Sequence, residues 1–70
     1  MQAPKQWAFA KVDHLLRESV IQPGIGRRKL AAVLTPLIED DHKRGLVTRA
    51  VPESTIYRSL KEEWGVWPVR

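Results

Sequence analysis

The residues best suited to chemistry lie in the stretch from Pro52 to Trp64. Ile56, Leu60 and Trp64 recur every four residues, which predicts one apolar stripe along a helix. Hydroxyl, phenol, guanidinium and ammonium groups lie off that stripe, on Ser54, Thr55, Tyr57, Arg58 and Lys61. Such groups hydrogen-bond to phosphate oxygens and base edges. A helix that packs on one side and shows them on the other can lie in the major groove of DNA.

Each of these side chains has an expected role in that interpretation. Arg58 is the best candidate for a bidentate contact to guanine, and Lys61, one turn later, would meet a backbone phosphate. Ser54 and Thr55 would touch phosphate or base edges from the first turn. Tyr57 would contact phosphate or pack on a thymine methyl group. The alternative is a surface helix whose Tyr57 and Arg58 only cover apolar neighbours.

A second group of cations, Arg27-Arg28-Lys29, follows the turn Gln22–Gly26 and opens another predicted helix. The helix dipole disfavours each positive charge there by roughly 0.3–1 kcal/mol. A bound phosphate would relieve that conflict and would use the free N–H groups of the same helix end. We therefore expect these three residues to contact the DNA backbone, and we also count Arg49 among the DNA-binding residues. The alternative is a solvated run of charge that salt screens.

Length and charge are consistent with a small basic domain. The 70 residues include 12 Lys and Arg against 8 Asp and Glu, a net charge of +4, with a pI near 10.0. This balance favours an anionic partner, of which nucleic acid is the commonest. A chain this short buries only about 60% of its unfolded surface, so a homodimer or a large protein partner would be a natural source of further stability.

Several classes of protein do not match the sequence. No apolar run approaches the roughly 20 residues that span a bilayer, and there is no cysteine, so we expect a cytoplasmic protein with no membrane contact. The run Glu39–Asp41 with His42 lacks the further ligands of a metal site. Neither histidine lies in a catalytic motif. We therefore expect no enzyme activity, no metal and no cofactor.

The apolar pattern predicts an all-α domain of three to four short helices that spans residues 1–70, with 65–70 as a tail. The first helix should run from about Pro4 to Val20 and end before Pro23. The second should begin near Arg27 and end near Arg44, before Gly45. Thr35-Pro36 either starts a new helix or kinks a single longer one.

Two segments and the core complete the expected fold. Residues 46–51 could form a short β-ribbon, a loop or a further turn of helix. Trp64 and Trp67 should fold back onto the core, because two tryptophans are rarely left in water. The expected core consists of Phe9, Val12, Leu16, Leu30, Val33, Leu34, Leu37, Ile56, Leu60 and Trp64.

The stretch from Val51 to Leu60 resembles the recognition helix of helix-turn-helix proteins, as found in resolvases, invertases and repressors. The matching residues are Val51, Ser54, Thr55, Ile56, Tyr57, Arg58 and Leu60. The resemblance covers about ten residues of the 70. It implies that this helix reads DNA sequence.

The remainder of the compact motif is imperfect. The turn position holds Ala50 in place of a glycine, the small-residue position holds Leu46, and Gly45 falls where helix is expected. Either the preceding helix is short and irregular, or the partner helix is the earlier segment Arg27–Leu34, with Ala31 and Ala32 as its close-packing residues.

These observations predict sequence-specific binding to double-stranded DNA. A small transcriptional regulator or a recombination accessory factor of a phage, plasmid or other mobile element would match, as would the DNA-binding domain of a longer protein. The alternative is a protein-interaction module without nucleic acid, in which two aromatic groups, Trp7 with Phe9 and Trp64 with Trp67, form a docking face.

Overall fold

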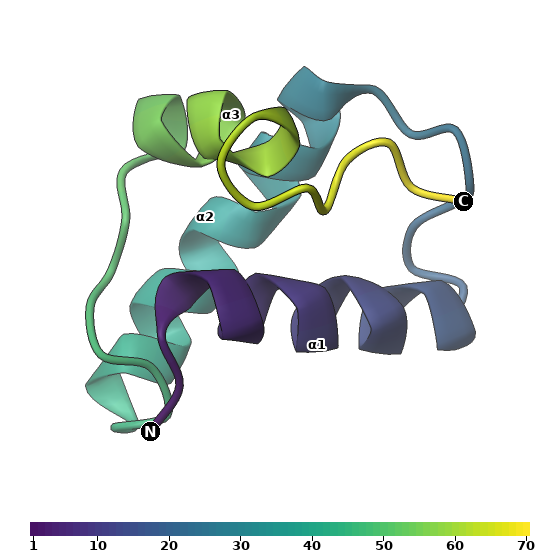
Figure 1. Cartoon of the computed structure of the whole chain (residues 1–70). Coiled ribbons are helices and arrows are strands. Elements are labelled where there is room, and N and C mark those ends of the chain that lie inside the picture. Colours follow the sequence, from purple (N-terminus) through teal and green to yellow (C-terminus); the bar gives the residue numbers. More distant parts are fainter.

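A computed structural model describes all residues from Met1 to Arg70, and it is an all-α domain with three helices (Figure 1). The helices are α1 (Pro4–Arg17), α2 (Arg27–Lys43) and α3 (Glu53–Lys61). In Figure 1, α1 runs along the bottom, α2 crosses behind it, and α3 lies at the top against α2. The predicted fold class is confirmed. None of these helices combines the length and the apolar character that crossing a bilayer requires.

The first helix ends earlier than expected. Ala3 is the N-cap, with Pro4 in the first turn, and the side chain of Gln6 accepts a hydrogen bond of 3.3 Å from the Ala3 N–H. The helix stops at Arg17 because Ser19 adopts a left-handed backbone conformation, with φ of 57°. A non-glycine residue at such an angle cannot continue a right-handed helix. The predicted end at Val20 was therefore wrong.

The second helix passes through Pro36 without interruption. Of the two alternatives left open by Thr35-Pro36, the single longer helix is the one that forms. The Thr35 hydroxyl donates a hydrogen bond of 2.7 Å to the Ala31 carbonyl, so it does not cap a new helix. As a result, the acidic run Glu39–Asp41 lies near the C-terminal end of α2. There Asp40 forms an ion pair with Arg44 at 3.1 Å.

The connection from Arg44 to Pro52 contains neither helix nor strand. The β-ribbon considered for residues 46–51 does not form, because these residues pair only with Gln2, in an isolated bridge to Val47. The Gln2 N–H donates to the Leu46 carbonyl, and the Thr48 N–H donates to the Gln2 carbonyl. Val47 and Val51 are buried and fasten the connection to the core.

The core agrees with the predicted one in part. Six of its expected members are buried, namely Val12, Leu30, Leu34, Ile56, Leu60 and Trp64. Leu16, Val33 and Leu37 are partly buried at its edge. Phe9 was wrongly placed in the core, since 48% of its surface is exposed. The buried side of α1 is formed instead by Trp7, Ala8, Val12 and Leu15.

The C-terminal segment, residues 65–69, returns across the front of the domain in Figure 1. The helix before it ends at Lys61, three residues before the predicted Trp64. The N–H groups of Val66 and Trp67 both donate to the Leu60 carbonyl. Trp64 is 6% exposed, and the ring of Trp67 packs against the core. The expectation that both tryptophans fold back is confirmed.

Candidate nucleic-acid interface

The site is built on the packing of α3 against α2. Ile56 and Leu60 are fully buried, so they fix the inner side of α3. Ser54, Arg58 and Lys61 are exposed, and their spacing of four and three residues puts them on one helical face. No helix lies between Lys43 and Glu53, so the helix that supports α3 is α2. Of the two candidates for the partner helix, the earlier segment is therefore the one observed.

A groove of about 480 Å³ lies between the first half of α2 and α3. It is lined by Arg28, Ala31, Glu53, Ser54, Tyr57 and Arg58. Ala31 is fully buried there, as expected of a close-packing residue. Ala32, its predicted companion, is exposed and does not line the groove. The groove therefore joins one predicted phosphate contact, Arg28, to the predicted base contact, Arg58.

Tyr57 is the centre of the basic cluster. The Arg27 Nη2 donates a hydrogen bond of 3.1 Å to the Tyr57 hydroxyl, and its guanidinium lies 4.2 Å from the centre of the ring. The guanidinium of Arg28 lies 4.8 Å from the same ring. Each cation–π contact at such a site contributes on the order of 0.5–1 kcal/mol. Tyr57 thus holds two guanidinium groups at the surface of α3.

The other predicted contact residues do not all join this cluster. Lys61 is exposed one turn beyond Tyr57, on the same side of α3. Lys29 instead lines a separate groove with residues 20–26. Thr55 is half-buried at the edge of the exposed face, and Arg49 lies in the exposed connection before α3. Lys29, Thr55 and Arg49 are therefore not part of the groove between α2 and α3 or of the cluster around Tyr57.

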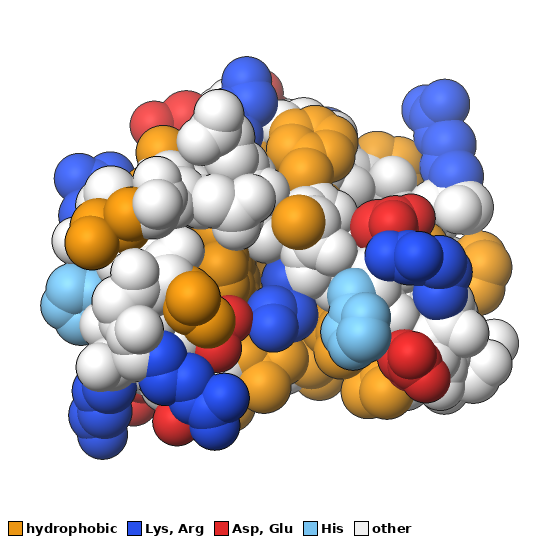
Figure 2. Space-filling model, turned by 90° about the horizontal axis from the view of Figure 1, so that it is seen from below, with side chains coloured by type: hydrophobic (Ala, Val, Ile, Leu, Met, Phe, Trp, Pro, Cys, Tyr) orange, Lys and Arg blue, Asp and Glu red, His pale blue; other side chains and the backbone are white.

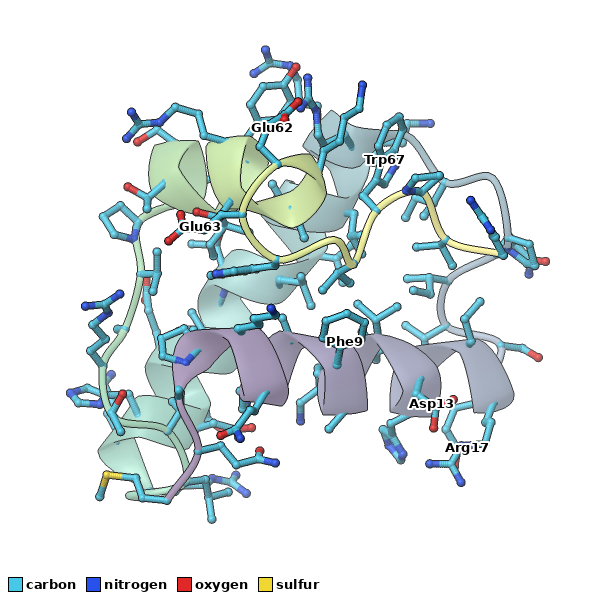
Figure 3. The ribbon with its side chains drawn as sticks, in the orientation of Figure 1. Phe9, Asp13, Arg17, Glu62, Glu63 and Trp67 are labelled. Carbon is cyan, nitrogen blue, oxygen red and sulfur yellow. The ribbon has the colours of Figure 1, made fainter.

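The cations of the two predicted groups have no ion-pair partner. The ion pairs of the molecule join Lys11 to Asp41, Arg17 to Asp13 and Arg44 to Asp40. Figure 2 shows the side of α1, where acidic and basic side chains lie next to one another. Figure 3 shows Asp13 and Arg17 there, pointing away from α3. Three cations on α1 and at the end of α2 thus have acidic partners, whereas the guanidinium groups of the groove have none.

The start of α2 also has unused donors. Its N-cap is Gly26, which offers no side-chain hydrogen bond, and the first turn holds no acidic residue. The N–H groups of this turn and the three cations that follow Gly26 favour an anion. Glu53 is the acidic residue in the groove, and it lies in the first turn of α3, where negative charge suits the helix dipole.

The acidic run at the end of α2 serves the fold. Asp41 is buried and accepts a hydrogen bond of 2.8 Å from the Trp7 Nε1. That bond, together with the nearby Lys11 ammonium, lowers the pKa of Asp41, although burial acts to raise it. His42 directs its Nδ1 to the Val47 carbonyl at 3.2 Å. The role of Asp41 was missed, since no spacing rule links it to Trp7.

The aromatic docking face of the alternative interpretation is not formed as expected. Trp7 is 2% exposed and Trp64 is 6% exposed, so neither is available to a partner. Phe9 is exposed by itself on α1. Trp67 lies beside the start of α2, where its ring centre is 5.6 Å from the Arg27 guanidinium (Figure 3). That contact was also missed, because it joins residues that lie far apart in the sequence.

No family model, no curated protein and no solved structure matches this chain. The function must therefore be argued from the charges and contacts of the site itself.

Proposed function

We propose that this domain binds double-stranded DNA in a sequence-specific manner through α3 and the start of α2. The observation that carries the proposal is the placement of Arg28 and Arg58 along one groove, with Tyr57 between the helices and no ion pair on either arginine. An unpaired cluster of guanidinium groups with phenol and hydroxyl groups suits phosphate oxygens and base edges alike.

The dimensions of α3 agree with a position in the major groove. An α-helix with its side chains is about 10–12 Å in diameter, and the major groove of B-DNA is about 12 Å wide. Arg58 occupies the middle of the exposed face, with Ser54 before it and Lys61 after it. In this arrangement Arg58 contacts a guanine edge, whereas Ser54 and Lys61 contact the phosphates of the flanking backbone.

The start of α2 supplies contacts that do not depend on sequence. Arg27 and Arg28 lie beside α3. The uncapped N–H groups of this helix end would bond the same anionic backbone. A guanidinium has five N–H donors, so the bond of Arg27 to Tyr57 leaves others free for a phosphate. These contacts would hold the register in which α3 meets the bases.

A domain with these properties would act by binding and not by catalysis. We place it as a small transcriptional regulator or a recombination accessory factor of a phage, plasmid or other mobile element, working in the cytoplasm. Pairing with a second copy or with a larger protein would add to the short contact surface of α3.

A salt titration tests the proposal. A fluorescent duplex of about 20 base pairs is titrated with protein at roughly 50 and 200 mM salt. Three phosphate contacts, from Arg27, Arg28 and Lys61, predict that the logarithm of the affinity falls with the logarithm of the salt concentration with a slope of about −2.7. Between the two salt concentrations the affinity should therefore fall roughly fortyfold. Selection from a random duplex library then shows whether one sequence is preferred. An absence of binding at the lower salt concentration would overturn the proposal.

A further inference from the structure

The C-terminal segment joins the end of α3 to the turn that precedes α2. The N–H groups of Val66 and Trp67 donate to the Leu60 carbonyl at 2.9 and 3.0 Å. At its other end, the Gly24 N–H donates to the Val69 carbonyl at 3.2 Å. The Trp67 indole Nε1 donates to the Ile25 carbonyl at 2.9 Å. The C-terminal segment thus links residues 24–27 to the last turn of α3 and fixes the distance between them.

Trp67 also contacts the basic cluster itself. The Arg27 guanidinium lies 5.6 Å from one aromatic ring, that of Trp67, and 4.2 Å from another, that of Tyr57. Arg27, the first residue of α2, is half-buried beside these rings, whereas Arg28 is exposed. A long flexible side chain that is already ordered loses less entropy when it binds a ligand. The contacts of Trp67 therefore prepare Arg27 for an anion before one arrives.

We infer that Trp67 is a positioning residue for the DNA-contacting surface. Its indole N–H holds the start of α2 through Ile25, and its ring holds the guanidinium of Arg27, which in turn bonds Tyr57. Through these contacts the C-terminal segment sets where the phosphate-binding groups stand relative to α3. This inference rests on the proposed function, because it assigns the role of Trp67 to the same surface.

The test is a double-mutant cycle on the duplex of about 20 base pairs at low salt. Trp67→Ala removes the ring and the hydrogen bond, so we expect affinity to fall roughly tenfold. Trp67→Phe keeps a ring for Arg27 and should recover part of that loss. In an Arg27→Ala background, Trp67→Ala should cost much less than tenfold. Val12→Ala, in the α1 core, controls for lost stability and should leave affinity unchanged.

A second readout does not depend on DNA. In NMR spectra of the free protein the Arg27 side chain should show nuclear Overhauser contacts to the Tyr57 ring, which lies 4.2 Å from its guanidinium, and Trp67→Ala should weaken those contacts. If those contacts stay unchanged, or if the two substitutions act additively on affinity, the positioning role is overturned while DNA binding stands. If the unaltered protein binds no duplex, the proposed function fails, and Trp67 is then left with a structural role only.

Discussion

The indole Nε1 of Trp7 donates a hydrogen bond of 2.8 Å to Oδ2 of Asp41, inside the core of the domain. The same carboxylate oxygen lies 3.1 Å from the Lys11 ammonium. One buried side chain thus joins α1 to the end of α2, at the far end of α2 from the candidate interface. A buried donor that loses its acceptor destabilises a protein by more than an exposed ion pair stabilises it.

Replacing Asp41 with alanine should lower the free energy of unfolding by about 1–3 kcal/mol, because the Trp7 N–H would remain buried without an acceptor. Urea unfolding followed by circular dichroism measures the change. Asp13→Ala is the matched control, since Asp13 forms an exposed ion pair with Arg17 and should change stability by less than about 0.5 kcal/mol. Equal effects of the two substitutions would contradict the structural role of Asp41.

Acid should weaken the domain through the same carboxylate. The hydrogen bond from Trp7, opposed by burial and supported by Lys11, gives Asp41 a pKa below its ordinary value of 3.8. A group with a depressed pKa in the folded state stabilises the fold above its unfolded pKa, and that contribution is lost as pH falls through the folded value. We expect the stability difference between the unaltered protein and Asp41→Asn to shrink below about pH 3.8. Thermal unfolding from about pH 2 to 6 would show it, and a constant difference would argue against it.

Because Phe9 is exposed, its replacement should destabilise the domain less than the replacement of a buried hydrophobic residue. Leu34→Ala opens a cavity at a fully buried site and should cost about 2–5 kcal/mol. Phe9→Ala, at a side chain that is 48% exposed, should cost less than about 1.5 kcal/mol. Urea unfolding of both variants compares them directly. A Phe9 substitution as costly as the Leu34 one would place Phe9 back in the core.

Pro36 should be a site where stability can be gained. It lies inside α2, where proline lacks the N–H that would bond the carbonyl of the residue four positions earlier, Ala32. Pro36→Ala restores that bond on the exposed side of the helix and should raise the free energy of unfolding by up to about 3 kcal/mol. A melting temperature that does not rise would show that the missing bond to the Ala32 carbonyl costs the helix little.

The sequence was sufficient for the features that depend on local pattern. The four-residue spacing of Ile56 and Leu60 predicted the buried side of α3, and Gly45 correctly marked the end of α2. Phe9 and Trp7 both stand near the start of α1, and the periodic pattern could not decide which of them is buried. That choice is made by Asp41, far along the chain, which gives the Trp7 N–H its acceptor.

Contacts between distant segments were also outside the reach of local pattern. The cations at Arg27–Lys29 looked equivalent in sequence, but helical rotation separates Lys29 from the two arginines beside Tyr57. The partner helix of α3 could not be chosen from spacing, because Ala31 meets α3 only across the long connection from Arg44 to Pro52. Trp67 lies beside the cluster because the C-terminal segment folds back, and local pattern does not predict that path.

The two arginines across the groove should respond differently to substitution. Arg58→Ala removes the proposed guanine contact and should reduce discrimination between the selected duplex and a random one by about 1–3 kcal/mol. Arg28→Ala removes a proposed phosphate contact, so it should weaken both duplexes alike and reduce the salt slope by about 1. Arg17→Ala, on the outer side of α1, is the control and should alter neither quantity. Anisotropy titrations with both duplexes at two salt concentrations separate these outcomes, and an Arg58→Ala protein with unchanged discrimination would remove α3 as the reader of sequence.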